Sequence, residues 1–290
     1  MAATLRVVSW NIRAAIGTGP FPDRWWTRID ADRLRAIGDF VAGLDADVVA
    51  LQEVALASRA GDLVDNAGDL ARQLGMEARY GAVRALEVTD ERGATVGAGL
   101  FGNALLSHRP MDEVRVLALP EAPIDAFVEP PEADHPAAGL RYADAPSGIR
   151  EPRCLLLATI DGMRIGTTHL SHVGSGERLL QAEACVAAFS EAPSVLLGDL
   201  NAAVDAPELT PFTSAGWTDG FGVPPRDSAR VSTDDGWRID HVLARGTSVD
   251  GCRVLRDAGD LSDHYPVVAE VSVLGRVLPG TDQPSAESPP

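Results

Sequence analysis

Residues 194–201, with the sequence SVLLGDLN, constrain the fold of this chain more than any other stretch. The three apolar residues before Gly198 are typical of a short buried strand, and Gly198 is expected to let the backbone turn directly after it. Asp199 and Asn201 then stand at the carboxyl end of that strand. In open α/β sheets, ligands bind just outside the carboxyl ends of the strands. Because Asp and Asn also shape ordinary turns, this stretch alone fits either a site or a turn.

Short apolar runs of strand length recur along the chain and alternate with segments of helical spacing. The predicted strands are residues 5–10, 47–51, 76–88, 98–107, 114–119, 154–160, 163–168, 195–197, 239–244, 248–256 and 265–273. The predicted helices are residues 30–44, 62–74 and 175–189, the second with Gly75 as its stop. Several of the strands end in Asn, Asp, Glu or His. The chain is therefore predicted to be an α/β protein with polar side chains gathered at strand ends.

The charge of the chain restricts its partners. The formal net charge is -17, and every basic side chain apart from histidine is arginine, because the sequence contains no lysine. Binding of duplex nucleic acid depends on phosphate neutralisation by clustered Lys and Arg. An extended nucleic-acid partner is therefore disfavoured, although a local basic groove is compatible with this total.

Composition and the ends of the chain indicate an ordinary globule with a tail. At 290 residues with 45% hydrophobic content, the chain can bury a large core. No apolar run reaches the roughly 20 residues that a membrane helix needs, and the first residues do not resemble a signal peptide. Three widely spaced cysteines suggest buried thiols in a reducing, cytoplasmic compartment. We expect one domain over residues 1–274 and a disordered tail over residues 275–290.

Oxygen-bearing side chains at the strand ends suit a hard divalent cation such as Mg2+, with Mn2+ as a substitute. Glu53 directly follows a buried apolar run, where an unpartnered carboxylate would be poorly solvated, so we expect it to bind the cation. An ion pair with an arginine is the alternative for Glu53. Asn11 and Asp263 are expected to complete the coordination of one or two ions, although Asn11 on its own would more often cap a turn.

The remaining polar residues fit hydrolysis of a phosphate ester. In-line attack of water on phosphorus needs a group that orients and deprotonates the water, and donors around the equatorial oxygens. We expect Asp199 to perform the first task and the amide of Asn201 the second. His264 offers a proton donor or a charged partner for phosphate, and Asp240 can hold its other ring nitrogen. His169 would supply a second donor. Which group takes the proton stays open, because coupled bases can share that work.

Four other residues are assigned by their neighbours in the sequence. Asn103 in FGNALLS is expected to face the substrate, although an Asn after Gly at a strand centre can also satisfy a bulge. His241 should point to the face opposite Asp240, because side chains alternate along a strand. Arg178 and Gln181 follow the pattern of one helix face, where a scaffolding role is expected.

The motifs SWNIR, LQEV, FGNALLS, TTHLS, GDLN, RIDHV and SDHYPV occur in this order from about Leu5 to Val273. Together they resemble the endonuclease/exonuclease/phosphatase superfamily, which includes deoxyribonuclease I and the inositol polyphosphate 5-phosphatases. The resemblance implies a four-layer sandwich of two packed mixed β-sheets flanked by helices. It also implies that Asp240 and His264 form an Asp-His pair, that Glu53 binds metal, and that Asp199 and Asn201 orient the nucleophile.

The substrate is less well determined by the sequence. A proline-rich excursion over residues 120–152 carries seven acidic residues against Arg141 and Arg150, and beside a cleft it would repel a polyanion. We therefore expect a small or headgroup-like phosphate ester, with Arg13, Arg24 and Arg28 available for extra phosphates. A nuclease of the same mechanism is the alternative. A noncatalytic binding module is less consistent with a chain in which every expected catalytic position is filled.

Overall fold

The computed structural model describes residues 3–19, 29–59, 62–90, 92–121, 152–172, 174–189, 193–203, 205–222 and 230–273. Most of the proline-rich excursion, the expected tail 275–290, Arg24 and Arg28 lie outside these residues. Among the helices in the described ranges, none combines the length and the apolar character needed to cross a bilayer.

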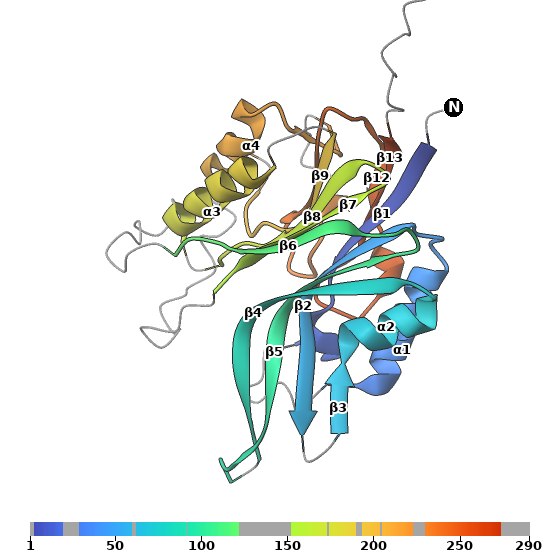
Figure 1. The fold of residues 1–290 in the computed structure, drawn as a ribbon, viewed down its shortest axis with the longest axis vertical. Helices are drawn as coiled ribbons and strands as arrows, with labels where there is room; N and C mark the ends of the chain where they lie inside the picture. The colour runs from blue at the N-terminus through green and yellow to red at the C-terminus, as the bar shows by residue number, and fades with distance from the viewer. Residues whose placement is uncertain are drawn as a thin grey trace, which may run out of the picture.

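Two mixed β-sheets pack face to face (Figure 1). The first, sheet A, has the strand order β12-β13-β1-β2-β5-β4, with β3 paired to β2. Its strands are β1 (Ala3–Asn11), β2 (Val48–Arg59), β3 (Asp62–Asp65), β4 (Glu77–Thr89), β5 (Thr95–Ser107), β12 (Val249–Val254) and β13 (Val267–Val273). The second, sheet B, has the order β10-β11-β9-β8-β7-β6. Its strands are β6 (Asp112–Ala118), β7 (Cys154–Ile160), β8 (Met163–His169), β9 (Ser194–Asp199), β10 (Thr218–Asp219) and β11 (Asp240–Arg245).

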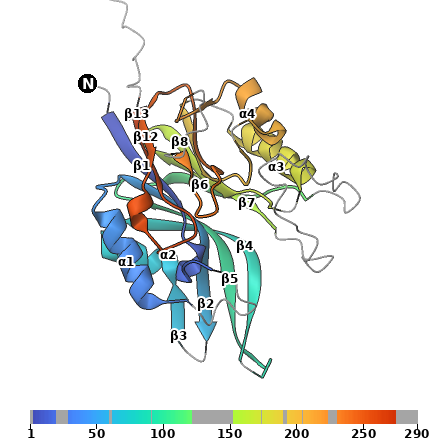
Figure 2. The ribbon, with the colours of Figure 1, turned by 180° about the vertical axis from the view of Figure 1, so that it is seen from behind.

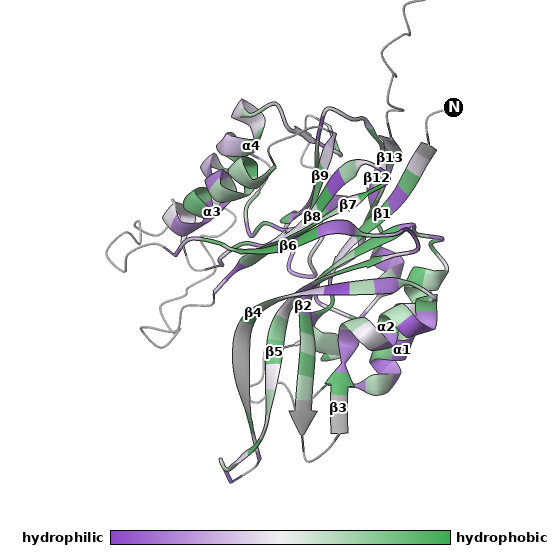
Figure 3. Ribbon diagram, in the orientation of Figure 1, coloured by the Kyte–Doolittle hydropathy of each residue, from purple (hydrophilic) through white to green (hydrophobic). Residues whose placement is uncertain are grey.

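Helices cover the outer face of each sheet. In Figures 1 and 2, α1 (Ala31–Ala42) and α2 (Asn66–Leu74) lie on sheet A, whereas α3 (Ser175–Ala188) and α4 (Thr210–Ser214) lie on sheet B. Three apolar clusters fill the spaces between the four layers. The helices are two-sided in hydropathy, with purple and green faces in Figure 3. The predicted four-layer sandwich is thus confirmed.

Strict alternation of side chains divides each central strand between two of these clusters. Along β1, Leu5 and Val7 enter the core between the sheets, whereas Val8 and Trp10 pack under α1 and α2. Along β9, Val195 enters the same central core and Leu196 packs under α3. The period of two fixes which face every later residue of each strand presents. It therefore also fixes the direction of the polar residues at the strand ends.

Three local predictions from the sequence need correction. Residues 62–65 form the short strand β3, so only residues 66–74 of the predicted second helix are helical. Gly198 does not turn the chain; β9 continues to Asp199, and glycine is required because an added Cβ would lie 2.0 Å from the Thr168 carbonyl oxygen. The strand predicted over residues 47–51 does not stop at Gln52; the observed strand β2 continues to Arg59. Gly75, in contrast, ends α2 in the left-handed conformation as expected.

Candidate active site

Three predicted site residues lie side by side on neighbouring strands of sheet B. His169 at the end of β8 is paired with Asp199 at the end of β9, and Asp199 is paired with Asp240 at the start of β11. Residues two positions along these strands from Asp199 and Asp240, Leu197 and Val242, belong to the core between the sheets. All three polar side chains therefore point inward, toward sheet A.

Sheet A supplies the opposite side of the site through a β-bulge. Asn11, at the end of β1, lies opposite Gln52 of β2, and the register of β2 against β5 shifts between Leu51 and Val54. Glu53 occupies the bulge with a φ of 53°, in the left-handed region. A regular strand would send Gln52 and Glu53 to opposite faces, but a bulge redirects a side chain. As a result, Gln52 donates to Thr167 of β8, and Glu53 accepts a hydrogen bond from Asn11.

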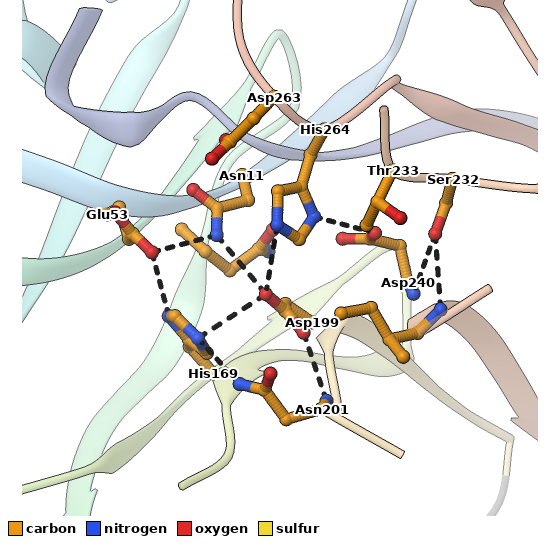
Figure 4. Close-up of polar contacts among 12 residues, drawn as sticks. Asn11, Glu53, His169, Asp199, Asn201, Ser232, Thr233, Asp240, Asp263 and His264 are labelled. Atoms are coloured by element: carbon orange, nitrogen blue, oxygen red, sulfur yellow. Dashed lines mark hydrogen bonds and ion pairs between the residues drawn. The ribbon is translucent and has the colours of Figure 1, made fainter. Parts of the chain in front are cut away.

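The carboxylate of Asp199 is the centre of the network (Figure 4). Its Oδ2 atom lies 3.2 Å from Nδ2 of Asn11, 3.3 Å from Nε2 of His169 and 3.7 Å from Nε2 of His264. Its Oδ1 atom accepts a hydrogen bond from the backbone N–H of Asn201 at 3.0 Å. Asn201 reaches this position with a φ of 47°, which Asn tolerates better than most residues. One carboxylate oxygen thus faces residues from both sheets.

His264 and His169 have opposite charge preferences. Nδ1 of His264 lies 2.8 Å from Oδ2 of Asp240, and Asp240 has an exposed fraction of 0%. Burial disfavours the charged ring, but the carboxylates of Asp240 and Asp199 outweigh burial and raise the pKa of His264 well above its usual value. Burial lowers the pKa of His169 well below its usual value, and Arg153 adds to this effect. The site therefore pairs a protonated imidazole with a neutral one.

The amide of Asn201 fixes the tautomer of the neutral ring. Nδ2 of Asn201 lies 3.0 Å from both the Leu170 carbonyl oxygen and Nε2 of His169. Because an amide nitrogen can only donate, Nε2 of His169 accepts and the ring proton sits on Nδ1. Nδ1 lies 3.9 Å from Oε1 of Glu53. Both amide hydrogens of Asn201 are thus used to hold the end of β8.

Burial also changes the acidity of Asp199. The pKa of this carboxyl is raised from 3.8 to about 6, mainly by burial, and the negative charge of Asp240 adds to the effect. The positive charge of His264 and the hydrogen bonds from Asn201 and Asn11 act in the opposite direction. A carboxyl group with a pKa near neutrality is suited to accept a proton during catalysis.

Asp263 joins the site through Arg13 rather than through the residues around Asp199. Nε of Arg13 lies 3.1 Å from Oδ2 of Asp263, and the Ser262 hydroxyl lies 3.3 Å from Oδ1. Ser262 also donates to the Asn11 carbonyl oxygen at 2.7 Å, and so links the SDH motif to the end of β1. Burial raises the pKa of Asp263, whereas His264 and Arg13 oppose the rise.

Sequence reasoning missed a second set of residues that support the Asp240–His264 pair. The hydroxyl of Ser232 accepts from the backbone N–H groups of Ile239 and Asp240, both at 3.2 Å. The Ser232 carbonyl oxygen accepts from Tyr265, and Thr233 forms a β-bridge with His264. Ser232 has an exposed fraction of 0% in a polar segment, which only the fold reveals. The sequence around Ser232 is typical of a turn, so nothing in it singles out this residue.

The other assigned residues have the following contacts. Nδ2 of Asn103 donates to the Cys154 carbonyl oxygen at 3.1 Å, which links β5 to β7; its role toward substrate stays a prediction. His241 points away from Asp240, and its ring contacts the Ala202 carbonyl oxygen, as expected for a structural residue. Arg178 forms a buried ion pair with Glu208, and Gln181 accepts from the Ser171 backbone, contacts that fit the scaffolding role expected of both.

Two groups of side chains have the donor atoms to hold a cation. Glu53 and Asn11 provide a carboxylate and an amide, and the side chain of Glu53 is 18% exposed. The second group consists of Asp199, Asp240 and His264, whose ligand atoms lie within 4.8 Å of one another, but a protonated His264 has no free ring lone pair to offer a cation. Oδ1 of Asp240 is buried without a hydrogen-bond partner, and the carboxylates of Asp199 and Asp240 lie on paired residues of neighbouring strands. This chemistry fits a hard divalent ion, which prefers oxygen ligands.

Comparisons with known proteins agree with this geometry. A family model described as the Endonuclease/Exonuclease/phosphatase family matches residues 8–264. No curated protein matches the sequence. A crystal structure of an endonuclease/exonuclease/phosphatase from Beutenbergia cavernae is 24% identical with a TM-score of 0.68, over 93% of this chain and 72% of that one.

Two further solved structures show the same fold at lower identity. The mannosyl-6-phosphatase of Bacteroides thetaiotaomicron is 19% identical with a TM-score of 0.60, over 92% of this chain and 99% of that one. The human Nocturnin catalytic domain, with a bound sulfate anion, is 15% identical with a TM-score of 0.60, over 93% and 94% of the two chains.

Proposed function

Because the chain belongs to the endonuclease/exonuclease/phosphatase family, we propose that it is a divalent-cation-dependent hydrolase of a small or headgroup-like phosphate ester. The reaction would be in-line attack of water on phosphorus. The observation that carries this proposal is the position of Asp199 Oδ2, which faces Asn11, His169 and His264 at 3.2, 3.3 and 3.7 Å. An amide, a neutral imidazole and a charged imidazole therefore surround one carboxylate oxygen.

Asp199 is the group that we expect to orient the attacking water and take its proton. The raised pKa of Asp199 lies closer to neutral pH than the pKa of an ordinary carboxyl group. The N–H of Asn201 holds Oδ1, so Oδ2 is the oxygen directed at the centre of the site. This fixed orientation is what a positioned base requires.

His264 is expected to stabilise the charge on the phosphoryl oxygens or to protonate the leaving oxygen. Its protonated state is maintained by Asp240 at 2.8 Å, and Ser232 holds the backbone of Asp240. Removing Asp240 or His264 would leave the other charged group buried without a partner of opposite charge. His169 would contribute a neutral ring, and Asn103 is retained as a candidate substrate contact.

We propose that Glu53 and Asn11 hold the cation, with Asp263 supporting the same side of the site. When bound, a Mg2+ or Mn2+ ion would neutralise the developing charge on a phosphoryl oxygen. Oδ1 of Asn11 accepts from the Arg13 backbone at 3.1 Å and keeps a second lone pair with which it could bind the cation. Glu53 would supply the charged oxygen, and it is therefore the principal proposed ligand.

The charge of the chain supports a small substrate. A net charge of -17 and an excess of acidic residues in the sequence of the 120–152 excursion oppose binding of a long polyanion. The fold is compatible with a compact phosphate ester, since the structurally similar Bacteroides protein is a mannosyl-6-phosphatase. A nuclease of the same mechanism is the second candidate, because the proposed catalytic groups would serve either substrate.

A substrate panel separates the two candidates. Purified protein would be assayed with Mg2+ or Mn2+ on sugar phosphates, inositol phosphates, small phosphodiesters, and single- and double-stranded DNA. We expect turnover of a small ester that is abolished in Asp199→Ala and His264→Ala. Efficient cleavage of plasmid DNA that requires the same two residues would instead establish the nuclease.

The matched controls are Asp112→Ala and His108→Ala. Both side chains are exposed, and they lie at the other end of the strands from the site. Asp112 is paired with Thr159, near the end of β7 remote from Cys154, and the backbone of His108 contacts Asp47 before β2 begins. Both variants should retain full activity. Equal loss in the control and site variants would contradict the proposal.

A further inference from the structure

A left-handed turn directly follows β1 and carries Arg13 into the site. Arg13, Ala14 and Ala15 have φ values of 48°, 49° and 60°, and all three residues are buried. Each non-glycine residue in this region is strained, and such strain persists only where surrounding contacts enforce it. Three consecutive residues of this kind beside a candidate active site indicate that the turn has a function beyond connecting two elements.

The contacts of Arg13 identify that function. Its backbone N–H donates to Oδ1 of Asn11 at 3.1 Å, its Nη1 donates to the Gly17 carbonyl oxygen at 2.7 Å, and its Nε lies 3.1 Å from Oδ2 of Asp263. The first contact orients the Asn11 amide. With Oδ1 held by Arg13, Nδ2 is directed at Glu53 and Asp199, at 3.0 and 3.2 Å.

We propose that Arg13 is a positioning residue: it sets the orientation of Asn11 and the side chain of Asp263, and thereby the shape of the cation-binding side. The proposal rests on the hydrolase function given above. Arg13 has an exposed fraction of 5%, and its Nε is directed at a carboxylate. These features favour a role inside the protein over the phosphate-binding role suggested by the arginines of the first loop.

The guanidinium group is needed for this arrangement. Its Nε and Nη1 atoms contact Asp263 and Gly17 at the same time, so one side chain closes the turn and holds the acid. A lysine has a single nitrogen and cannot reproduce this fork. Without the fork, the strained turn would relax, and Asn11 would lose the backbone N–H that orients it.

The test compares Arg13→Met and Arg13→Lys with Arg33→Met. Arg33 contacts the same turn through the Ala15 carbonyl oxygen at 3.5 Å, and it pairs with Asp30, so its substitution removes an equal charge from the other end of the turn. Mn2+ affinity would be measured by calorimetry without substrate. We expect about 10–100-fold weaker binding in Arg13→Met, partial recovery in Arg13→Lys and no change in Arg33→Met.

Two further readouts separate this proposal from the function on which it rests. Steady-state kinetics at saturating Mn2+ should show a lower kcat with a nearly unchanged KM in Arg13→Met; a higher KM with unchanged Mn2+ affinity would make Arg13 a substrate ligand and overturn the proposal. The side-chain amide signals of Asn11, followed by NMR, should shift and exchange faster in Arg13→Met alone. If the wild type hydrolyses no ester, unchanged Asn11 signals would still refute the role of Arg13.

Discussion

The Nε2 atom of His264 lies 3.7 Å from Oδ2 of Asp199, beyond hydrogen-bonding distance but close enough for opposite charges to stabilise each other. The two groups meet although His264 lies between β12 and β13 of sheet A and Asp199 ends a central strand of sheet B. Their mutual effect is visible in both directions, since His264 lowers and burial raises the pKa of Asp199, whereas Asp199 raises that of His264. The acid–base properties of the site therefore belong to the pair.

The contribution of Asp199 to the free energy of unfolding of the cation-free protein should fall as the pH rises. Its folded-state pKa of about 6 lies above the unfolded value of 3.8, so the folded state binds the extra proton. Stability from this group is present below pH 4 and is lost as the pH rises through 6, by up to about 3 kcal/mol at about 1.4 kcal/mol per tenfold change. Denaturant unfolding in EDTA should show that Asp199→Asn stabilises the protein more at pH 8 than at pH 5. An equal effect at both pH values would contradict the assignment.

Asp240→Asn should lower turnover by changing the charge of His264. The carboxylate at 2.8 Å maintains the imidazolium, and an amide in its place cannot do so. We expect the pKa of His264 to fall toward its usual value, and kcat to fall by about 10²–10⁴-fold. NMR titration of the His264 ring measures the first effect and initial rates the second. A His264 ring that titrates as in the wild type would exclude this explanation.

Glu53→Gln should weaken cation binding by at least about tenfold. The matched control is Glu113→Gln, because Glu113 has the same left-handed backbone, with a φ of 48°, and its exposed side chain pairs with Arg164 far along the sheet. Calorimetric titration with Mg2+ and Mn2+ compares the two variants directly. Unchanged affinity in Glu53→Gln would remove Glu53 from the cation site.

Asn201→Gly should separate the backbone role of Asn201 from its side-chain role. Glycine accepts a φ of 47° without strain, so the N–H bond to Asp199 is retained while the amide contacts to His169 and Leu170 are lost. We expect kcat to fall by about 10–100-fold and stability to fall by about 1–3 kcal/mol, because two hydrogen bonds are lost. Asp45→Gly, at an exposed position with a φ of 52°, provides the control. Full activity in Asn201→Gly would show that the amide is dispensable.

Removing one partner of the ion pair between Arg178 and Glu208 should destabilise the fold. Their side chains are 4% and 2% exposed, and Nη2 lies 2.8 Å from Oε1. Arg178→Met leaves a buried carboxylate uncompensated and should destabilise the fold by about 3–5 kcal/mol. Adding Glu208→Leu should recover most of that loss. Thermal and denaturant unfolding of the single and double variants provide the test.

The positions of most strands along the chain and the polar residues at their ends were predictable because apolar periodicity is a local feature of the sequence. The four-layer arrangement was predicted from the resemblance of the seven motifs to a known family, and the order of the strands within each sheet was not predicted. The bulge that directs Glu53 into the site was not predictable, because it depends on the pairing of β2 with β5. Neither was the role of Arg13, since its partner Asp263 is 250 positions away and the left-handed turn has no glycine to signal it.

The position of β1 has a consequence for biosynthesis. β1 is made before the other strands of the two described sheets, and it pairs on one side with β2 and on the other with β13, which ends at Val273. Until translation delivers β13, one edge of β1 lacks its partner and is exposed to wrong partners. The nascent protein should therefore stay inactive until β13 has left the ribosome, and a truncation that removes β13 should yield insoluble protein rather than a weakened catalyst.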